Sequence, residues 1–172
     1  ILKGEENWCQ GFSEPGAGSD LASLKCRAEV DGHHLVVNGT KIWTTYAEHA
    51  VWQELLVRTD PDLPRHKGIS WAICDMRSPG IDVRPLVQAQ GISHFNEVFL
   101  SDVHVPVANV VGEVGEGWAA TRTTLRSESS MISGASQSTG FTAVLATARR
   151  TGRNTDPVTR QVLAQVHTEE SI

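Results

Sequence analysis

The sequence predicts an α+β protein in which an antiparallel β-barrel or β-sandwich domain is followed by an antiparallel pair of helices. Short runs of apolar residues, separated by turn-forming dipeptides, fill roughly the first two thirds of the 172 residues. The apolar spacing becomes helical after Gly117. We therefore expect residues 1–8 to be the tail of a preceding element, residues 9–112 to form the β domain, and residues 113–172 to begin a helical domain.

The expected strands are short and follow one another closely. Asp31-Gly32 and Asn38-Gly39 are strong hairpin signals, because both central residues of a type I′ turn need positive φ. Each of these dipeptides is therefore predicted to join two strands of a meander. The expected strands are residues 8–12, 24–30, 35–37, 41–43, 51–58, 69–75, 81–87, 96–100 and 103–107.

Two helices are expected after Gly117. The first carries an apolar stripe and is predicted to be one long helix, softened at Gly134 and Gly140. Asp156-Pro157 then supplies an N-cap and a first helical residue. The apolar stripe of the first helix comprises Trp118, Leu125, Ile132, Phe141, Val144, Leu145 and Ala148, and that of the second comprises Val158, Val162 and Val166.

The composition is that of an ordinary globular protein. A net charge of −5 argues against a nucleic-acid partner, and no apolar run is long enough to cross a membrane. The three cysteines lack C-x-x-C spacing, so we expect buried thiols in a reducing compartment. The seven histidines form no ligand motif, so no metal is expected. These features predict a soluble, cytoplasmic protein.

The most informative stretch is Ser13-Glu14-Pro15-Gly16-Ala17-Gly18-Ser19-Asp20. Pro15 fixes its own φ, and Gly16 and Gly18 permit positive φ, so successive N–H groups can point into one concavity. Such a concavity suits an anionic or carbonyl-bearing ligand. Taken alone, the same pattern is equally typical of an ordinary turn between strands.

Phe12 to Asp20 resembles a sequence motif of the acyl-CoA dehydrogenase family, flavoenzymes that introduce a double bond between Cα and Cβ of an acyl thioester. Lys41-Ile42-Trp43-Thr44-Thr45 resembles the second flavin-contacting strand of that family. The resemblance covers almost the whole chain and implies the middle β domain and the first C-terminal helices. The N-terminal helical domain of the family is absent from this sequence, as are its last helices.

The resemblance implies FAD as the cofactor, with hydride passed from Cβ to flavin N5 and electrons passed on to an electron-transfer flavoprotein. It also implies an acyl-CoA substrate and a homo- or hetero-oligomer. An indole can wall the isoalloxazine and a hydroxyl can donate to its polar edge. The implied flavin-contacting residues are Gln10, Phe12, Ser13, Trp43, Thr44 and Thr45, with Arg150 and Gln161 matching loosely a neighbouring subunit's FAD site. Gly11 stands where the family usually has a larger residue, which would loosen the wall.

Glu128 is the candidate catalytic base. It lies three residues after Leu125, near the apolar stripe, where a carboxylate becomes a better proton acceptor. The resemblance places the base of a minority of the family at this position, and that of most members beyond the end of this chain. The implied substrate-binding residues are Ser19, Arg126, Ser127 and Ser129, the last of which replaces the arginine common in the family.

Plainer interpretations remain open for each residue. Trp43 is also compatible with a core position on a hairpin strand, and Glu128 with a half-solvated position beside Arg122 and Arg126. Arg150 also suits an exposed helix end. For the chain as a whole, the alternatives are a non-catalytic β module of a flavoprotein complex and acyl-CoA oxidase chemistry.

Overall fold

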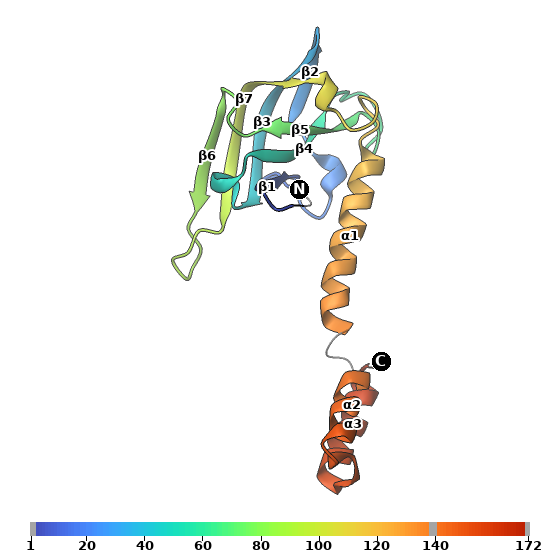
Figure 1. The fold of residues 1–172 in the computed structure, drawn as a ribbon. Coiled ribbons are helices and arrows are strands. Elements are labelled where there is room, and N and C mark those ends of the chain that lie inside the picture. Colours follow the sequence, from blue (N-terminus) through green and yellow to red (C-terminus); the bar gives the residue numbers. More distant parts are fainter. Residues whose placement is uncertain (1–2, 138–140, 171–172) are drawn as a thin grey trace. The chain divides into compact units, whose positions relative to one another are not determined.

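The computed structural model describes residues 3–137 and 141–170, except for the side chains of residues 131–137 and 169–170 (Figure 1). The chain divides into two compact units, Ile1–Arg122 and Thr123–Ile172. The first unit contains the β domain and the first residues of one helix, and the second contains the remaining helical residues. None of the described helices is long and apolar enough to cross a membrane.

The first unit is built on one curled seven-stranded sheet. Its order is β1-β4-β2-β3-β7-β6, with β5 paired to the other side of β4. The strands are β1 (Trp8–Gly11), β2 (Arg27–Asp31), β3 (His34–Thr45), β4 (Trp52–Arg58), β5 (Ile69–Asp75), β6 (Ile81–Leu86) and β7 (Phe95–Pro106).

The predicted α+β class, with a β domain before the helices, is confirmed, but the sheet is mixed and not purely antiparallel. β1 runs parallel to β4, with Trp8 opposite Trp52 and Gly11 opposite Leu55. A single parallel bridge also joins β2 to β4. Antiparallel neighbours can be joined by a tight turn, whereas β1 reaches β4 only through the intervening β2 and β3, which allows a parallel alignment.

The curled sheet encloses an apolar core. Leu35, Val37, Leu55 and Val98 are fully buried within it. Burying each such side chain contributes about 1.5–3 kcal/mol. The prediction of buried thiols is confirmed, since all three cysteines are unpaired and lie in the same core.

The hairpin expected at Asp31-Gly32 is confirmed, although its central residues are Gly32 and His33 and only Gly32 takes positive φ, so the turn is not type I′; the hairpin expected at Asn38-Gly39 is wrong. Asp31 pairs with His34 across the turn, whereas β3 continues without interruption through Asn38 and Gly39. Gly39 has a φ of +156°, and a Cβ there would lie 2.7 Å from Cys26 Sγ. The glycine is therefore needed for close packing and not for a turn.

The pairing of β3 with β7 contains two register shifts, each of which we treat as a β-bulge. At the first, two β7 residues, Ser101 and Asp102, lie opposite Asn38. Asn38 donates from Nδ2 to Asp102 Oδ1 (2.9 Å) and accepts at Oδ1 from the Asp102 N–H (2.9 Å). This bulge explains why the strands expected at 96–100 and 103–107 form a single strand.

The helices are α1 (Trp118–Gln137), α2 (Phe141–Arg150) and α3 (Pro157–Glu170). The expected single long helix is thus α1 and α2, and residues 138–140, including Gly140, lie outside the described residues, as does the side chain of Ile132. α2 and α3 form the expected helical pair.

The start of α3 and its packing on α2 follow from a few side chains. The N-cap prediction is confirmed, since Asp156 Oδ2 accepts from the Thr159 N–H (2.8 Å). The predicted stripe on α3 is wrong in part, because Val158 and Val162 are exposed and Leu163 is buried instead. Ala148 of α2 is also buried.

Candidate flavin-binding site

The loop after β1 forms a tight bend. The Glu14 N–H donates to the Ala17 carbonyl (2.9 Å) and the Ala17 N–H donates to the Glu14 carbonyl (3.0 Å), so Pro15 and Gly16 occupy the centre of the turn. The expectation of positive φ at Gly16 and Gly18 is wrong, since neither residue takes it. A Cβ at either glycine would nevertheless meet no atom within 4 Å, so both sides of the bend are open.

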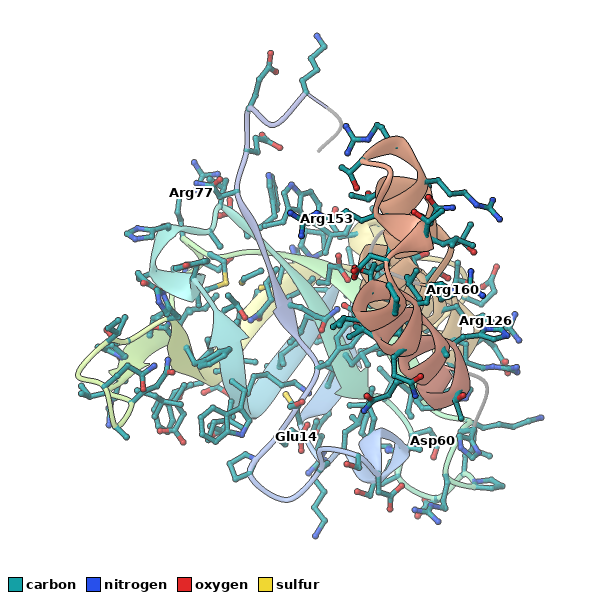
Figure 2. The ribbon with its side chains drawn as sticks, turned by 90° about the horizontal axis from the view of Figure 1, so that it is seen from below. Glu14, Asp60, Arg77, Arg126, Arg153 and Arg160 are labelled. Carbon is teal, nitrogen blue, oxygen red and sulfur yellow. The ribbon has the colours of Figure 1, made fainter. Side chains whose placement is uncertain are left out.

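A buried ion pair ties this loop to β3. Lys41, which is fully buried, donates from Nζ to Glu14 Oε1 (2.7 Å) and to the Phe12 carbonyl (3.2 Å). The Glu14 carboxylate also accepts from the N–H groups of Lys25 (2.7 Å) and Cys26 (2.9 Å). Glu14 lies where the chain bends back below the sheet (Figure 2). Sequence reasoning missed this pair, although a lysine within an apolar strand was a usable signal.

The two segments predicted to contact a flavin lie side by side. The Ile42 N–H donates to the Ser13 carbonyl (2.9 Å), which joins the loop to β3. Directly after it, the side chains of β3 alternate, with Trp43 and Thr45 exposed and Thr44 buried. Trp43 is 58% exposed and meets Phe95 edge-on, with a centroid separation of 5.9 Å.

The remaining first-strand residues differ in accessibility. Gln10 and Ser13 are partly exposed, whereas Phe12 is buried. Because the side chains of Phe12 and Thr44 are buried, only the main chain of these two residues is available to a ligand on the exposed face. The structure therefore brings together Ser13, Trp43 and Thr45 among the predicted side chains.

These groups fit an isoalloxazine ring. A bulky residue rarely adopts positive φ, and a large exposed aromatic side chain calls for a functional explanation. Trp43 shows both features, with a φ of +61°. Its indole offers a flat apolar face, and Thr45, which is also exposed, offers a hydroxyl donor two residues later on the same strand.

The predicted looseness at Gly11 is not found. A Cβ at Gly11 would lie 2.6 Å from Cδ of Gln53, a fully buried residue of β4. The space left by the missing side chain is therefore filled by Gln53. Sequence alone could not identify this pairing, because the two residues are 42 positions apart and meet only through the parallel register of β1 and β4.

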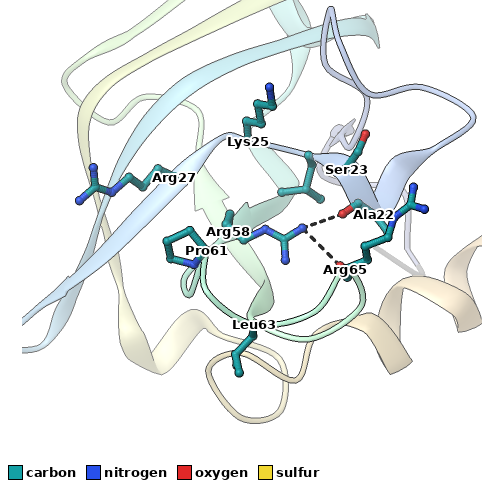
Figure 3. A pocket seen from close by; sticks show the side chains of 9 residues that line it. Ala22, Ser23, Lys25, Arg27, Arg58, Pro61, Leu63 and Arg65 are labelled. Atoms are coloured by element: carbon teal, nitrogen blue, oxygen red, sulfur yellow. Dashed lines mark hydrogen bonds between the residues drawn. The ribbon is translucent and has the colours of Figure 1, made fainter.

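A pocket of about 360 Å³, which we call the cationic pocket, is lined on one side by residues that follow the loop, from Ala22 to Arg27, and otherwise by Arg58 and by residues from Pro61 to Arg65 (Figure 3). Lys25, Arg27, Arg58 and Arg65 contribute its charges. Arg58 donates to the carbonyls of Ala22 (2.6 Å) and Lys67 (2.8 Å), and partial burial lowers the pKa of its guanidinium. Arg58 thereby holds the pocket walls together. Sequence analysis did not single out this cluster.

A second, smaller pocket of about 210 Å³ lies directly against the loop. Glu14, Pro15 and Gly16 line it, and it shares Ser23 and Lys25 with the cationic pocket. The far wall of the cationic pocket is connected to the loop as well, because Arg65 forms an ion pair with Asp20, the residue after Ser19. The predicted substrate-contacting Ser19 thus lies beside a cationic surface.

The predicted helical site residues belong to the second unit and are described there by themselves. In α1, Glu128 is half-buried, as is Leu125 one turn before it. Arg126, Ser127 and Ser129 are exposed, and the Arg126 side chain extends outward from the helix (Figure 2).

The two serines do not present free hydroxyl protons. Ser127 Oγ donates to the Thr123 carbonyl (3.2 Å) and Ser129 Oγ donates to the Leu125 carbonyl (2.9 Å). Each hydroxyl therefore retains acceptor capacity for a ligand. Arg150 of α2 and Gln161 of α3 are both exposed. Within the described residues, no group of three or more His, Cys, Asp or Glu side chains is placed to hold a metal ion.

Comparisons with known proteins agree with the fold. A family model described as the middle domain of acyl-CoA dehydrogenase matches residues 9–103. Acyl-CoA dehydrogenase FadE34 of Mycobacterium tuberculosis is 55% identical over 128 residues, covering 74% of this chain and 18% of that protein. Acyl-CoA dehydrogenase IpdE1 of the same organism is 40% identical over 166 residues, covering 95% of this chain and 43% of that protein.

Solved structures agree as well. A structure described as the Tcur3481-Tcur3483 steroid ACAD has a TM-score of 0.71 and 36% identity, covering 97% of this chain and 44% of that one. The chain spans less than half the length of each of these three relatives. Since the matching family model covers more than half of the chain, the chain belongs to the acyl-CoA dehydrogenase family.

Proposed function

We propose that this chain contributes the flavin wall and the thioester-side loop of an enzyme that carries out FAD-dependent α,β-dehydrogenation of an acyl-CoA thioester. The observation that carries the proposal is the exposure of the Trp43 indole and of Thr45 on β3, directly after the hydrogen bond from the Ile42 N–H to the Ser13 carbonyl that joins this strand to the loop. FAD, when bound, supplies the two-electron acceptor for this reaction.

The residues of the β domain have distinct roles in this proposal. Trp43 excludes water from one face of the ring, and Thr45 donates a hydrogen bond to its polar edge. Gln10 and the main chain of Phe12, Ser13 and Thr44 complete the wall. Ser19, next to the ion-paired Asp20, contacts the acyl-CoA.

The residues of the helical unit supply the remaining functions. The Glu128 carboxylate takes the proton from Cα of the thioester. Arg126, Ser127 and Ser129 line the acyl pocket. Arg150 and Gln161 hold the pyrophosphate and adenine of the FAD of a neighbouring subunit, which requires an oligomer. We expect an electron-transfer flavoprotein as the redox partner.

The cationic pocket suits the phosphate groups of coenzyme A. Guanidinium and ammonium groups form strong charge-assisted hydrogen bonds to phosphate oxygens. Lys25 and Arg65 both line this pocket, and a smaller pocket that shares Lys25 with it lies against the loop at Gly16. An elongated ligand with a phosphate-bearing end and a thioester end matches this arrangement.

The first substrate to test is a steroid-derived acyl-CoA, since one structural relative is described as a steroid ACAD. The two protein names in that description likewise make a hetero-oligomer the first assembly to test. A straight-chain acyl-CoA serves as the comparison substrate.

The test is the absorption spectrum of the purified full-length protein. We expect flavin bands that bleach when an acyl-CoA is added anaerobically. Glu128→Gln should keep the flavin bands and lose the bleaching, whereas Glu113→Gln, an exposed carboxylate outside the site, should behave as the wild type. Unchanged bleaching in Glu128→Gln would refute its role as the base.

The alternative is a non-catalytic β module of a flavoprotein complex. A colourless protein that takes up no added FAD would support this alternative, and so would FAD uptake without bleaching by any acyl-CoA.

A further inference from the structure

The exposed indole and hydroxyl of the candidate site are presented by the second β-bulge, which we define as Lys41 to Thr44 of β3. Lys41 pairs with Val98 and Thr44 pairs with Asn96, so that Ile42 and Trp43 together lie opposite one residue of β7. The φ of Trp43 is +61°, a conformation that an L residue with a bulky side chain rarely adopts. Such a conformation persists only where surrounding contacts over-determine it.

One buried polar contact fixes the start of this bulge. Lys41 Nζ donates to Glu14 Oε1 (2.7 Å) and to the Phe12 carbonyl (3.2 Å), with the lysine side chain fully buried. The next N–H, that of Ile42, donates to the Ser13 carbonyl. The strand is therefore held against the loop immediately before Trp43.

A second buried polar contact fixes the end of the bulge. Asn96, also fully buried, donates from Nδ2 to the Thr44 carbonyl (3.2 Å) and to the Glu48 carboxylate. The chain leaves the strand one residue after Thr45, where the Tyr46 N–H donates to the His94 carbonyl (2.9 Å). Each end of the bulge is thus held by hydrogen bonds from a buried side chain, Lys41 at the start and Asn96 at the end.

We infer that Lys41 and Asn96 are positioning residues that lock the bulge in its strained conformation and so hold the Trp43 indole and the Thr45 hydroxyl ready for the flavin. This inference rests on the proposed function for its purpose, but the lock itself exists in the protein without cofactor. Neither residue touches the exposed face. Both act through the main chain of β3, by fixing the carbonyl or the strand segment that flanks Trp43.

The other bulge of the same strand pair provides a matched control. There, the exposed Asn38 exchanges two hydrogen bonds with Asp102 across a register shift of the same size and between the same two strands. Asn38→Ala and Asn96→Ala therefore each remove the two hydrogen bonds of one asparagine side chain from one bulge. Only the latter removes them from the bulge that carries Trp43.

The test compares these two variants in the apoprotein and with FAD. The contribution of Trp43 to the near-ultraviolet circular dichroism is obtained by subtracting the spectrum of the corresponding Trp43→Phe protein. We expect Asn96→Ala to lose most of the Trp43 contribution and to lower the affinity for FAD at least tenfold. Asn38→Ala should leave both unchanged. If Asn96→Ala does not fold, Asn96→Leu, which retains the buried volume, replaces it.

A Trp43 contribution that survives in Asn96→Ala, or that is lost equally in Asn38→Ala, would overturn the inference. This outcome is separable from failure of the proposed function. A wild-type protein that takes up no FAD would reject the flavin role while the dichroism of the apoprotein still decides whether the lock exists. A further variant pair, Lys41→Met and Lys41→Arg, should show loss of the Trp43 contribution in the former and at least partial recovery in the latter.

Discussion

Replacing Gly11 by alanine should destabilise the β domain, because the new methyl group would meet Gln53. The added Cβ would lie 2.6 Å from Cδ, 2.7 Å from Nε2 and 3.0 Å from Cγ of that side chain. Gln53 is fully buried, so its side chain would have to rearrange within the packed core to admit the methyl group. Inserting a methylene into a packed core costs about 1–3 kcal/mol, and we expect Gly11→Ala to fall in this range.

The assay is urea unfolding followed by tryptophan fluorescence. All five tryptophans lie between residues 8 and 118, so the signal reports on the first unit, Ile1–Arg122. Shortening the partner should relieve the clash. The loss of unfolding free energy in the double variant Gly11→Ala/Gln53→Ala should therefore be smaller than the sum of the two single losses by about 1 kcal/mol or more. The reasoning is refuted if the two substitutions are additive, or if Gly11→Ala alone leaves the unfolding free energy unchanged.

Gly16→Ala is the matched control for this series. A Cβ there meets no atom within 4 Å and the residue does not take positive φ. Its unfolding free energy should therefore be unchanged or raised by about 0.4–1 kcal/mol, through the reduced entropy of the unfolded chain.

Three further predictions follow from the buried and capping groups. Lys41→Met, measured by the same urea assay, should cost about 3–5 kcal/mol because it leaves Glu14 buried without its ion pair, and adding Glu14→Gln should recover much of that loss. All three thiols should resist iodoacetamide at pH 8 in the folded chain and react in urea, since burial raises even the lowest of their pKa values, that of Cys26, to about 11. Hydrogen bonds from Thr159 lower the pKa of Asp156. The stability that this N-cap gives to α3 should therefore persist above about pH 4 and be lost as the pH falls through the lowered pKa. The loss should appear as a drop in the helical circular dichroism signal, and Asp156→Ala should abolish this pH-dependent drop.

Local patterns predicted those features that depend on neighbouring residues. The Asp31-Gly32 turn needs positive φ, and Gly32 takes it with a φ of +55°. The Asp156-Pro157 helix start likewise needs only residues within one turn. In each case the deciding interaction spans a few positions of the chain.

The misses depend on partners that are distant in sequence. Asn38-Gly39 has the composition of a type I′ turn, yet the glycine serves the close approach of Cys26, and the asparagine binds Asp102, which lies 64 residues away. The dipeptide alone cannot show whether its residues form a turn or instead contact residues that are distant in the sequence. The same holds for Gly11, whose meaning became clear only when the parallel register of β1 and β4 placed Gln53 over it.

The buried lysine raises a question that stability alone does not answer. A buried ion pair can often be exchanged for apolar residues of similar volume without loss of stability. Burial of the pair therefore does not account for Lys41 and Glu14. Apolar contacts, however, tolerate sliding, whereas a lysine that must reach both Glu14 Oε1 and the Phe12 carbonyl fixes the position of β3 relative to the loop. The exposed indole follows two residues later, at a φ that no relaxed strand would choose. A fixed position at Lys41 is therefore what the proposed flavin wall at Trp43 requires, and under that proposal it accounts for a charged pair where a stable core would need none.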